Sequence, residues 1–150
     1  MLIYFAAPLF CQAELEFNLQ LAQKLERRGF SVFLPQRDGV EVRKPPYAEM
    51  SPDELCQVIF TLDRDKILAA DIFLFILDGR VPDEGACVEL GIAHSHKHML
   101  NQEKLLIGLQ TDMRAPFAFL GSKLNAMIHA ALDHISDNEQ DLIASLEAYK

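Results

Sequence analysis

Short apolar runs alternate along the chain with longer segments in which apolar residues recur at helical spacing. Four runs predict strands: Leu2–Phe5, Ser31–Leu34, Asp71–Leu77 and Lys104–Leu109. The run that ends at Leu77 is nearly continuous after its first residue, as in a central parallel strand buried on both faces. Strands that alternate with helices are typical of βαβ units. We therefore predict an α/β protein with a doubly wound parallel sheet and helices on both faces.

The segments between these strands carry helix signals. In the first segment, apolar residues recur at helical spacing and Gly29 follows two arginines, which predicts the helix end. The other helices are expected after Ser51–Pro52, from near Gly85 to about His98, around Lys123–Leu132 after a loop through Pro116, and after a cap at Ser136–Asp137. Pro35–Met50 contains three prolines and mixed charge, so it is expected to be a long loop, and such loops are often functional.

No internal repeat or linker divides the sequence, so we treat residues 1–150 as a single domain of the flavodoxin-like (Rossmann-like) class. A chain of this length can bury roughly two thirds of the surface that it exposes when unfolded. Its three cysteines form no C-x-x-C pair, which suits a reducing compartment. The longest apolar runs are too short to span a membrane, and Met1 leads directly into a strand, so a cytoplasmic location is expected.

The charge balance excludes one class of partner. The chain has 14 Lys and Arg against 22 Asp and Glu, a net charge of −8, and no basic block. Binding to nucleic acid through phosphate neutralisation is therefore not expected. No glycine-rich phosphate-binding motif follows a strand. Because the carboxyl ends of parallel strands meet at one edge, function is expected in the loops after Phe5, Leu34, Leu77 and Leu109.

Glu89 is the acidic residue in a stretch, Gly85–His94, that is otherwise small or apolar. An ionised carboxylate there is costly unless it is paired, and its side chain can lean back toward the strand ends. Asp83 lies six residues upstream, where it either caps the helix or adds a second carboxyl to the same crevice. Two such carboxyls can act as the nucleophile and acid of a retaining glycosyl transfer. Tyr4 could place its phenol against the glutamate.

Three segments, Ile3–Phe10, Asp83–Ala93 and Leu124–Ile128, resemble the signature blocks of the nucleoside 2-deoxyribosyltransferases in the same order. The resemblance covers nearly the whole chain. It implies transfer of 2-deoxyribose between purine or pyrimidine bases through a covalent deoxyribosyl-glutamate, without a metal or cofactor. It also implies that 2′-deoxynucleosides and free nucleobases are the partners.

The resemblance assigns roles to individual residues. Glu89 is similar to the family's nucleophile, and Tyr4 to the tyrosine that orients it. Asp83 and Asp63 resemble two acids on the base side, of which the second is thought to exchange a proton with the ring nitrogen. Asn125 resembles an asparagine that reaches from a neighbouring subunit to the 5′-hydroxyl, which implies a homo-oligomer of unspecified size. The remaining substrate contacts are expected from Met127, Gln36, Asp38, Gly85, Pro8 and Phe10.

Two departures and one difficulty accompany these assignments. Ala7 and Ala86 stand where the family often has glycine and threonine. An unbroken helix from Pro52 to Ala69 would carry Asp63 away from the crevice, so its role is expected to require a break near Thr61. Gln36 and Asp38, together with Arg37, Arg43 and Tyr47, either meet the edge of the base or belong to a solvated loop.

Two other functions compete with the transferase. The 2-deoxynucleoside 5′-monophosphate hydrolases are similar in fold but usually have a serine where Asn125 stands, and an amide suits a neutral 5′-hydroxyl better than a phosphate. In a receiver-like binding module, Asp78 would be the phospho-acceptor, but no acidic pair follows the first strand to hold Mg²⁺. His94, His96 and His98 lack an accompanying carboxylate or fourth ligand, so we expect no metal site.

Overall fold

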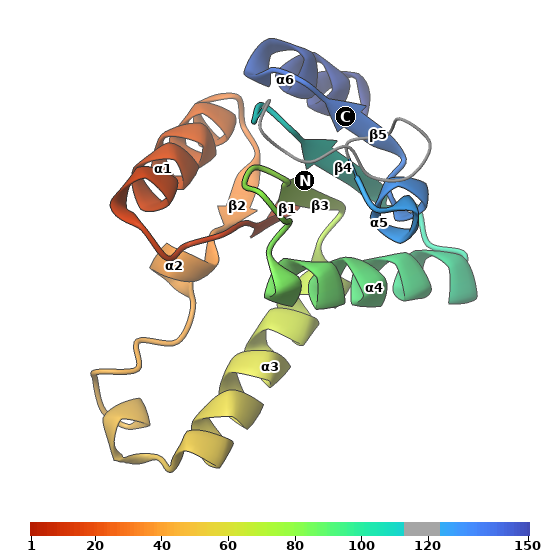
Figure 1. The fold of residues 1–150 in the computed structure, drawn as a ribbon. Helices are drawn as coiled ribbons and strands as arrows, with labels where there is room; N and C mark the ends of the chain where they lie inside the picture. The colour runs from red at the N-terminus through yellow and green to blue at the C-terminus, as the bar shows by residue number, and fades with distance from the viewer. Residues whose placement is uncertain (113–123) are drawn as a thin grey trace.

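The computed structural model describes residues 1–112 and 124–150. Its centre is a five-stranded, all-parallel sheet of order β2-β1-β3-β4-β5 (Figure 1). The strands are β1 (Leu2–Ala6), β2 (Ser31–Phe33), β3 (Ile72–Ile76), β4 (Leu105–Leu109) and β5 (His134–Ser136). The strand order reverses between β1 and β3, which is the flavodoxin-like arrangement. The predicted fold class is therefore confirmed.

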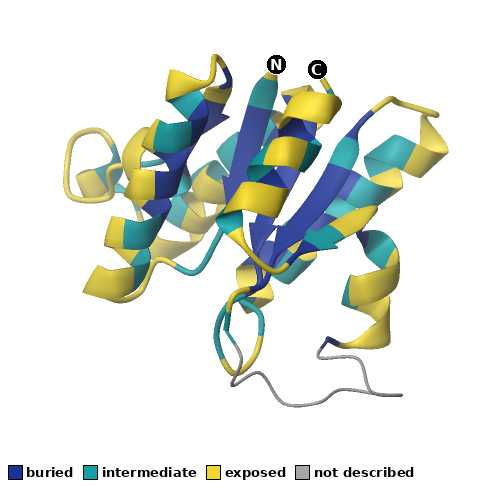
Figure 2. Cartoon of the chain, turned by 90° about the horizontal axis from the view of Figure 1, so that it is seen from above, coloured by how far each residue is buried: buried dark blue, intermediate teal, exposed yellow. Residues whose placement is uncertain are grey.

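Helices cover both faces of the sheet (Figures 1 and 2). One face packs against α1 (Gln12–Arg27) and α6 (Glu139–Ala148), and the other against α3 (Pro52–Ala69), α4 (Glu84–Met99) and α5 (Ala126–Ala131). A short helix α2 (Pro35–Asp38) and a 3-10 turn η1 (Tyr47–Glu49) lie between β2 and α3. No helix in the described part of the chain is long and apolar enough to cross a bilayer.

The alternation of side chains along β1 divides the core into two halves. Ile3 and Phe5 pack on the α1 and α6 side, whereas Tyr4 packs on the α3 and α4 side. The Tyr4 ring is fully buried and stacks between Phe33 and Phe73, with ring centroids 5.6 and 5.8 Å away. This stacking fixes the direction of the phenol, because three neighbouring strands each contribute one ring.

The last third of the chain differs from the prediction. We expected Ser136–Asp137 to cap the final helix, but Ser136 is buried at the end of β5 and Asn138 caps α6 by accepting from the amide of Asp141. The strand was missed because its three residues include one large apolar side chain. The helix expected from Lys123 begins at Ala126. The loop through Pro116 and Lys123 itself lie outside the described residues.

Two further predictions about the middle of the chain are wrong. The expected long loop Pro35–Met50 contains α2 and η1. The break near Thr61 that the role of Asp63 was expected to require is absent, since α3 continues without interruption from Pro52 to Ala69. A capping box fixes the first residue of α3: the Ser51 hydroxyl accepts from the amide of Glu54, and the Glu54 carboxylate accepts from the amide of Ser51.

Candidate active site

A hydrogen bond between β1 and α4 forms the centre of the candidate site. The Tyr4 hydroxyl donates to Oε1 of Glu89 at 2.7 Å. The rings of Phe33 and Phe73 on either side hold the Tyr4 ring in place. Glu89 lies on the second turn of α4 and is half-buried. The glutamate is therefore held in one orientation by a neutral donor that carries no positive charge to neutralise it.

Asp63 joins this pair from α3. The Tyr4 hydroxyl lowers the pKa of Asp63, and the charge of Asp63 raises the pKa of Glu89. The unbroken α3 does not carry Asp63 away, because the helix packs along α4 and its next turn, at Ile67, is buried against the sheet. The expectation that an unbroken helix would separate Asp63 from Glu89 is therefore wrong.

Asp63 and Glu89 line one pocket of about 340 Å³ between α3 and α4. The other residues that line it are mostly apolar: Cys56, Ile59, Phe60, Arg64, Ile67, Gly85, Val88 and Ile92. Sequence reasoning did not identify Ile59 and Phe60 as pocket residues, because apolar positions on an amphipathic helix are ordinarily assigned to the core. Only the packing of α3 beside α4 shows that these two side chains remain exposed.

Burial controls the protonation of this cluster. The pKa of Glu89 is raised to about 7, mainly by desolvation and also by the charges of Asp63 and Asp83, against the lowering effect of the Tyr4 hydrogen bond. Desolvation also raises the pKa of Asp63. The pKa of Tyr4 is raised far above its ordinary value, first by burial and then by Glu89, so the phenol stays protonated. The Tyr4 hydroxyl opposes the effect of burial at both carboxyls, because it lowers the pKa of Asp63 as well as that of Glu89.

Asp83 has a different environment. Its Oδ2 accepts from the amide of Ala86 at 2.8 Å, so it caps α4. Its negative charge raises the pKa of Glu89. Gly85 follows in the first turn, where a β-carbon would lie 3.2 Å from that same Oδ2. A side chain at position 85 would therefore crowd the oxygen of Asp83 that forms the cap.

The side chains of Gln36 and Asp38, the two substrate contacts predicted in α2, form hydrogen bonds within the protein. Gln36 accepts from Asn18 and donates to the carbonyl of Leu15, so both ends of its amide are bound to α1. Asp38 accepts from the amide of Leu34 and pairs with Arg37. The structure therefore gives both side chains contacts that hold α2 in place, and it does not bring them to Glu89.

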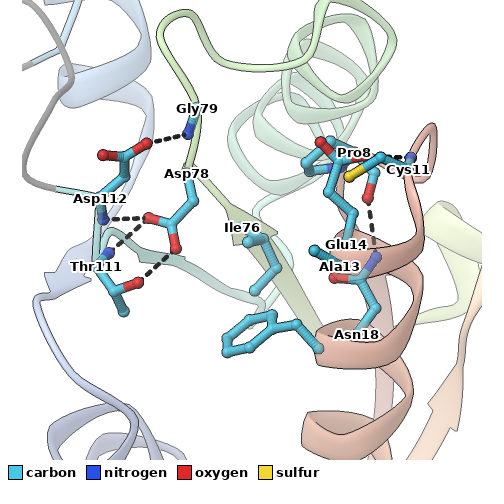
Figure 3. A pocket seen from close by; sticks show the side chains of 11 residues that line it. Pro8, Cys11, Ala13, Glu14, Asn18, Ile76, Asp78, Gly79, Thr111 and Asp112 are labelled. Carbon is cyan, nitrogen blue, oxygen red and sulfur yellow. Dashed lines mark hydrogen bonds between the residues drawn. The ribbon is translucent and has the colours of Figure 1, made fainter.

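The remaining predicted residues do not line the pocket that contains Asp63 and Glu89. Phe10 and Met127 are among the most exposed apolar residues, at 78% and 80%. Asn125 is exposed and caps α5, since its Oδ1 accepts from the amide of Met127. Pro8 lines a second cavity, of about 530 Å³, at the carboxyl ends of the strands (Figure 3).

The carboxylates of this strand-end cavity are already engaged within the chain. Glu14 accepts from the amides of Phe10 and Cys11. Asp78 accepts from Thr111 and Asp112 (Figure 3). The pocket between α3 and α4 instead combines two carboxyls of raised pKa with mainly apolar walls, which is the environment expected of acid–base chemistry.

The histidines of α4 show no metal site in the part of the chain that the structure describes. There, no three His, Cys, Asp or Glu side chains gather as ligands. The His94 and His98 rings lie one turn apart, with centroids 4.2 Å from each other.

Comparison with known proteins identifies one family. The sequence profile described as nucleoside 2-deoxyribosyltransferase matches residues 3–129. No curated protein matches the sequence.

Solved structures share the fold. A conserved protein from Enterococcus faecalis V583 has a TM-score of 0.78 and 24% identity over 99% of this chain and 98% of its own. A 2-deoxyribosyltransferase from Bacillus psychrosaccharolyticus has a TM-score of 0.70 and 24% identity over 95% and 90%. A CMP N-glycosidase from Clostridium botulinum has a TM-score of 0.55 and 22% identity over both full chains. At these identities, the similarity shows the fold alone.

Proposed function

This chain belongs to the nucleoside 2-deoxyribosyltransferase family, and we propose that it transfers 2-deoxyribose from one purine or pyrimidine base to another. The observation that carries the proposal is the hydrogen bond from Tyr4 to Glu89 beside Asp63 in one largely apolar pocket. It supplies a held carboxylate to attack the sugar and a second carboxyl to protonate the departing base.

In the first half of the reaction, the ionised Glu89 carboxylate attacks C1′ of the deoxynucleoside. The C1′–N bond breaks, its electron pair leaves with the base, and Asp63 gives its proton to the base nitrogen. A deoxyribosyl ester at Glu89, a free base and an Asp63 carboxylate result. Tyr4 keeps the attacking oxygen in place and stabilises its charge before the bond forms.

In the second half, a different base enters and its ring nitrogen attacks C1′. Asp63 takes the proton that this nitrogen loses, and the Glu89 carboxylate is released. The apolar walls contributed by Ile59, Phe60 and Val88 favour a planar base over water in this step. Both carboxyls return to their starting state, so no cofactor is consumed.

We further propose that a second copy of the chain completes the site. Asn125 and Met127 face solvent at the start of α5, and neither lines the pocket that contains Glu89 and Asp63. The exposed side of α4 beside the pocket is apolar at Val88 and Met99. An apolar helix face next to an incomplete site fits a symmetric contact between copies.

Subunit sharing predicts recovery of activity in mixed oligomers. Glu89→Ala and Asn125→Ala variants should each be nearly inactive alone. When the two are co-expressed, about a quarter of the sites in a random dimer would combine an intact Glu89 with an intact Asn125. Co-purified mixtures should therefore regain about that fraction of the wild-type exchange rate. Mixtures no more active than the separate variants would contradict this arrangement.

Hydrolysis of deoxynucleoside 5′-monophosphates is the second candidate function. The CMP N-glycosidase of similar fold is the observation that favours it. The exposed amide of Asn125 favours the nucleoside instead, because an amide matches a neutral 5′-hydroxyl and lacks the charge to balance a phosphate.

The exchange reaction itself tests the proposed function. The protein, incubated with a 2′-deoxynucleoside and a different free base, should form the exchanged nucleoside, measured by chromatography over time. Purine and pyrimidine donors should both be tried, each with and without an acceptor base. Absence of any exchanged product would contradict the transferase, and hydrolysis confined to 5′-monophosphates would establish the second function.

A further inference from the structure

A group of hydrogen bonds joins the carboxyl ends of β3 and β4 (Figure 3). Oδ1 of Asp78 accepts from the amides of Thr111 and Asp112 at 2.6 and 2.7 Å, and Oδ2 accepts from the Thr111 hydroxyl at 2.5 Å. In return, Oδ2 of Asp112 accepts from the amide of Gly79 at 3.2 Å. We call Asp78, Gly79, Thr111 and Asp112 the β3–β4 latch.

The latch fixes an unusual turn. Gly79 has φ +124°, a conformation that residues with a side chain rarely adopt, and its amide is used in the latch. Both oxygens of Asp78 are occupied by three donors from one neighbouring segment. Asp78 therefore joins the loop after β3 to the loop after β4. It is poorly suited to be a phospho-acceptor, because a phospho-acceptor needs an accessible oxygen.

The turn leads directly into the helix that carries Glu89. From Gly79 the chain continues to Asp83, which caps α4, and Glu89 follows on the next turns. On the sheet, Tyr4 pairs in register with Phe73 of β3. The position of α4 relative to β3 therefore decides whether the glutamate meets the phenol, and the β3–β4 latch lies at the junction between the two.

We propose that Asp78 is a positioning residue for the reaction, because it holds the start of α4 so that Glu89 stays hydrogen-bonded to Tyr4. The relevance to catalysis rests on the proposed function, in which Glu89 is the nucleophile. Asp78 acts through the latch and the cap of α4, and it makes no contact with the reacting groups.

Loss of the latch has a consequence that can be measured without substrate. The Tyr4 hydrogen bond lowers the pKa of Glu89 against the larger effect of burial. If α4 shifts enough to break the hydrogen bond to Tyr4 but leaves Glu89 buried, the lowering effect is lost and Glu89 keeps its proton to a higher pH. A substitution that only reduces global stability leaves the folded protein, and hence this titration, unchanged.

The experiment is a pH titration of the Glu89 carboxyl carbon by ¹³C NMR, with the signal assigned through its absence in Glu89→Gln. Tyr4→Phe gives the shift for complete loss of the hydrogen bond. Asp78→Ala should move the midpoint upward by at least about half of that shift, and Thr111→Val by a smaller amount in the same direction. Thr111→Ser, which keeps the hydroxyl, should restore the wild-type midpoint. Asn138→Ala is the matched control, because it also removes a side-chain oxygen that accepts a backbone amide, but on α6.

Exchange kinetics provide the second readout. Asp78→Ala should lower kcat about tenfold with little change in KM, as expected for a misplaced nucleophile. An unchanged Glu89 midpoint in Asp78→Ala and Thr111→Val would overturn the proposal, even if both variants are less stable. If Asp78→Ala fails to fold, the two Thr111 variants decide alone. A wild-type protein without exchange activity would contradict the proposed function, whereas the titration would still test the latch.

Discussion

Glu89→Gln is expected to abolish base exchange, with a rate at least about 10⁴-fold below that of the wild type. The amide keeps the shape of the side chain and can still accept from Tyr4, but it cannot attack C1′ and form a stable ester. Release of the first base should be measured in single-turnover experiments with the wild type and the variant. Mass spectrometry of the intact, acid-quenched protein should show a deoxyribosyl adduct on the wild type and none on the variant. Substantial exchange by the variant would exclude Glu89 as the nucleophile.

The same substitution has an expected effect on stability, with a sign set by the pKa. Burial raises the pKa of Glu89 from 4.5 to about 7 in the folded protein. The folded state therefore binds more protons than the unfolded state between these values, and its stability falls as the pH rises through this window. Glu89→Gln should raise the Tm at pH 8 and lose this advantage toward pH 4.5. A variant that is less stable at pH 8 would contradict the burial of an ionised carboxylate.

Asp63→Asn is expected to lower kcat/KM for exchange by about 10²- to 10⁴-fold, the usual contribution of general acid–base catalysis. The asparagine retains the size of the side chain but has no proton to give to the departing base. The loss should shrink for a donor whose base leaves readily as an anion. A series of donors with different leaving bases, measured at saturating acceptor, checks this dependence.

Asp83→Asn is the matched control for that substitution. Asp83 caps α4, and asparagine caps helices about as well as aspartate. The fold should therefore be retained, and the dependence on the leaving base should match the wild type. If Asp83→Asn instead shows the strong dependence and Asp63→Asn does not, the proton is delivered by Asp83.

The sequence was sufficient for the fold class because the strands of the sheet centre are long and strongly apolar. The run ending at Leu77 is buried throughout β3. The edge strand β5 was missed because its exposed His134 and half-buried Ile135 leave no alternating or continuous apolar pattern. A short edge strand forms because it pairs with a neighbouring strand, here β4. The pattern of apolar residues along the sequence does not predict that pairing.

The candidate site was predictable where local chemistry was unusual. An acid within a small, apolar helix segment singled out Glu89, and its partner Tyr4 followed from the strand end. The place of Asp63 was harder to predict, because it depends on how α3 packs against α4. The spacing of apolar residues along one helix does not indicate that packing. Gln36 stays a prediction; its amide accepts from Asn18 and donates to the carbonyl of Leu15, contacts that the sequence did not indicate.

The Tyr4–Glu89 hydrogen bond joins residues that are 85 positions apart in the chain. Between them the chain must complete β2, cross to β3 and return with α4 before the phenol has an acceptor. Contacts of such high sequence separation form late, because the entropy of closing the intervening loops must be overcome first. The proposed nucleophile therefore meets its hydrogen-bond donor only when the sheet and α4 have come together, and a partly folded chain with much of its secondary structure intact would still lack this pair.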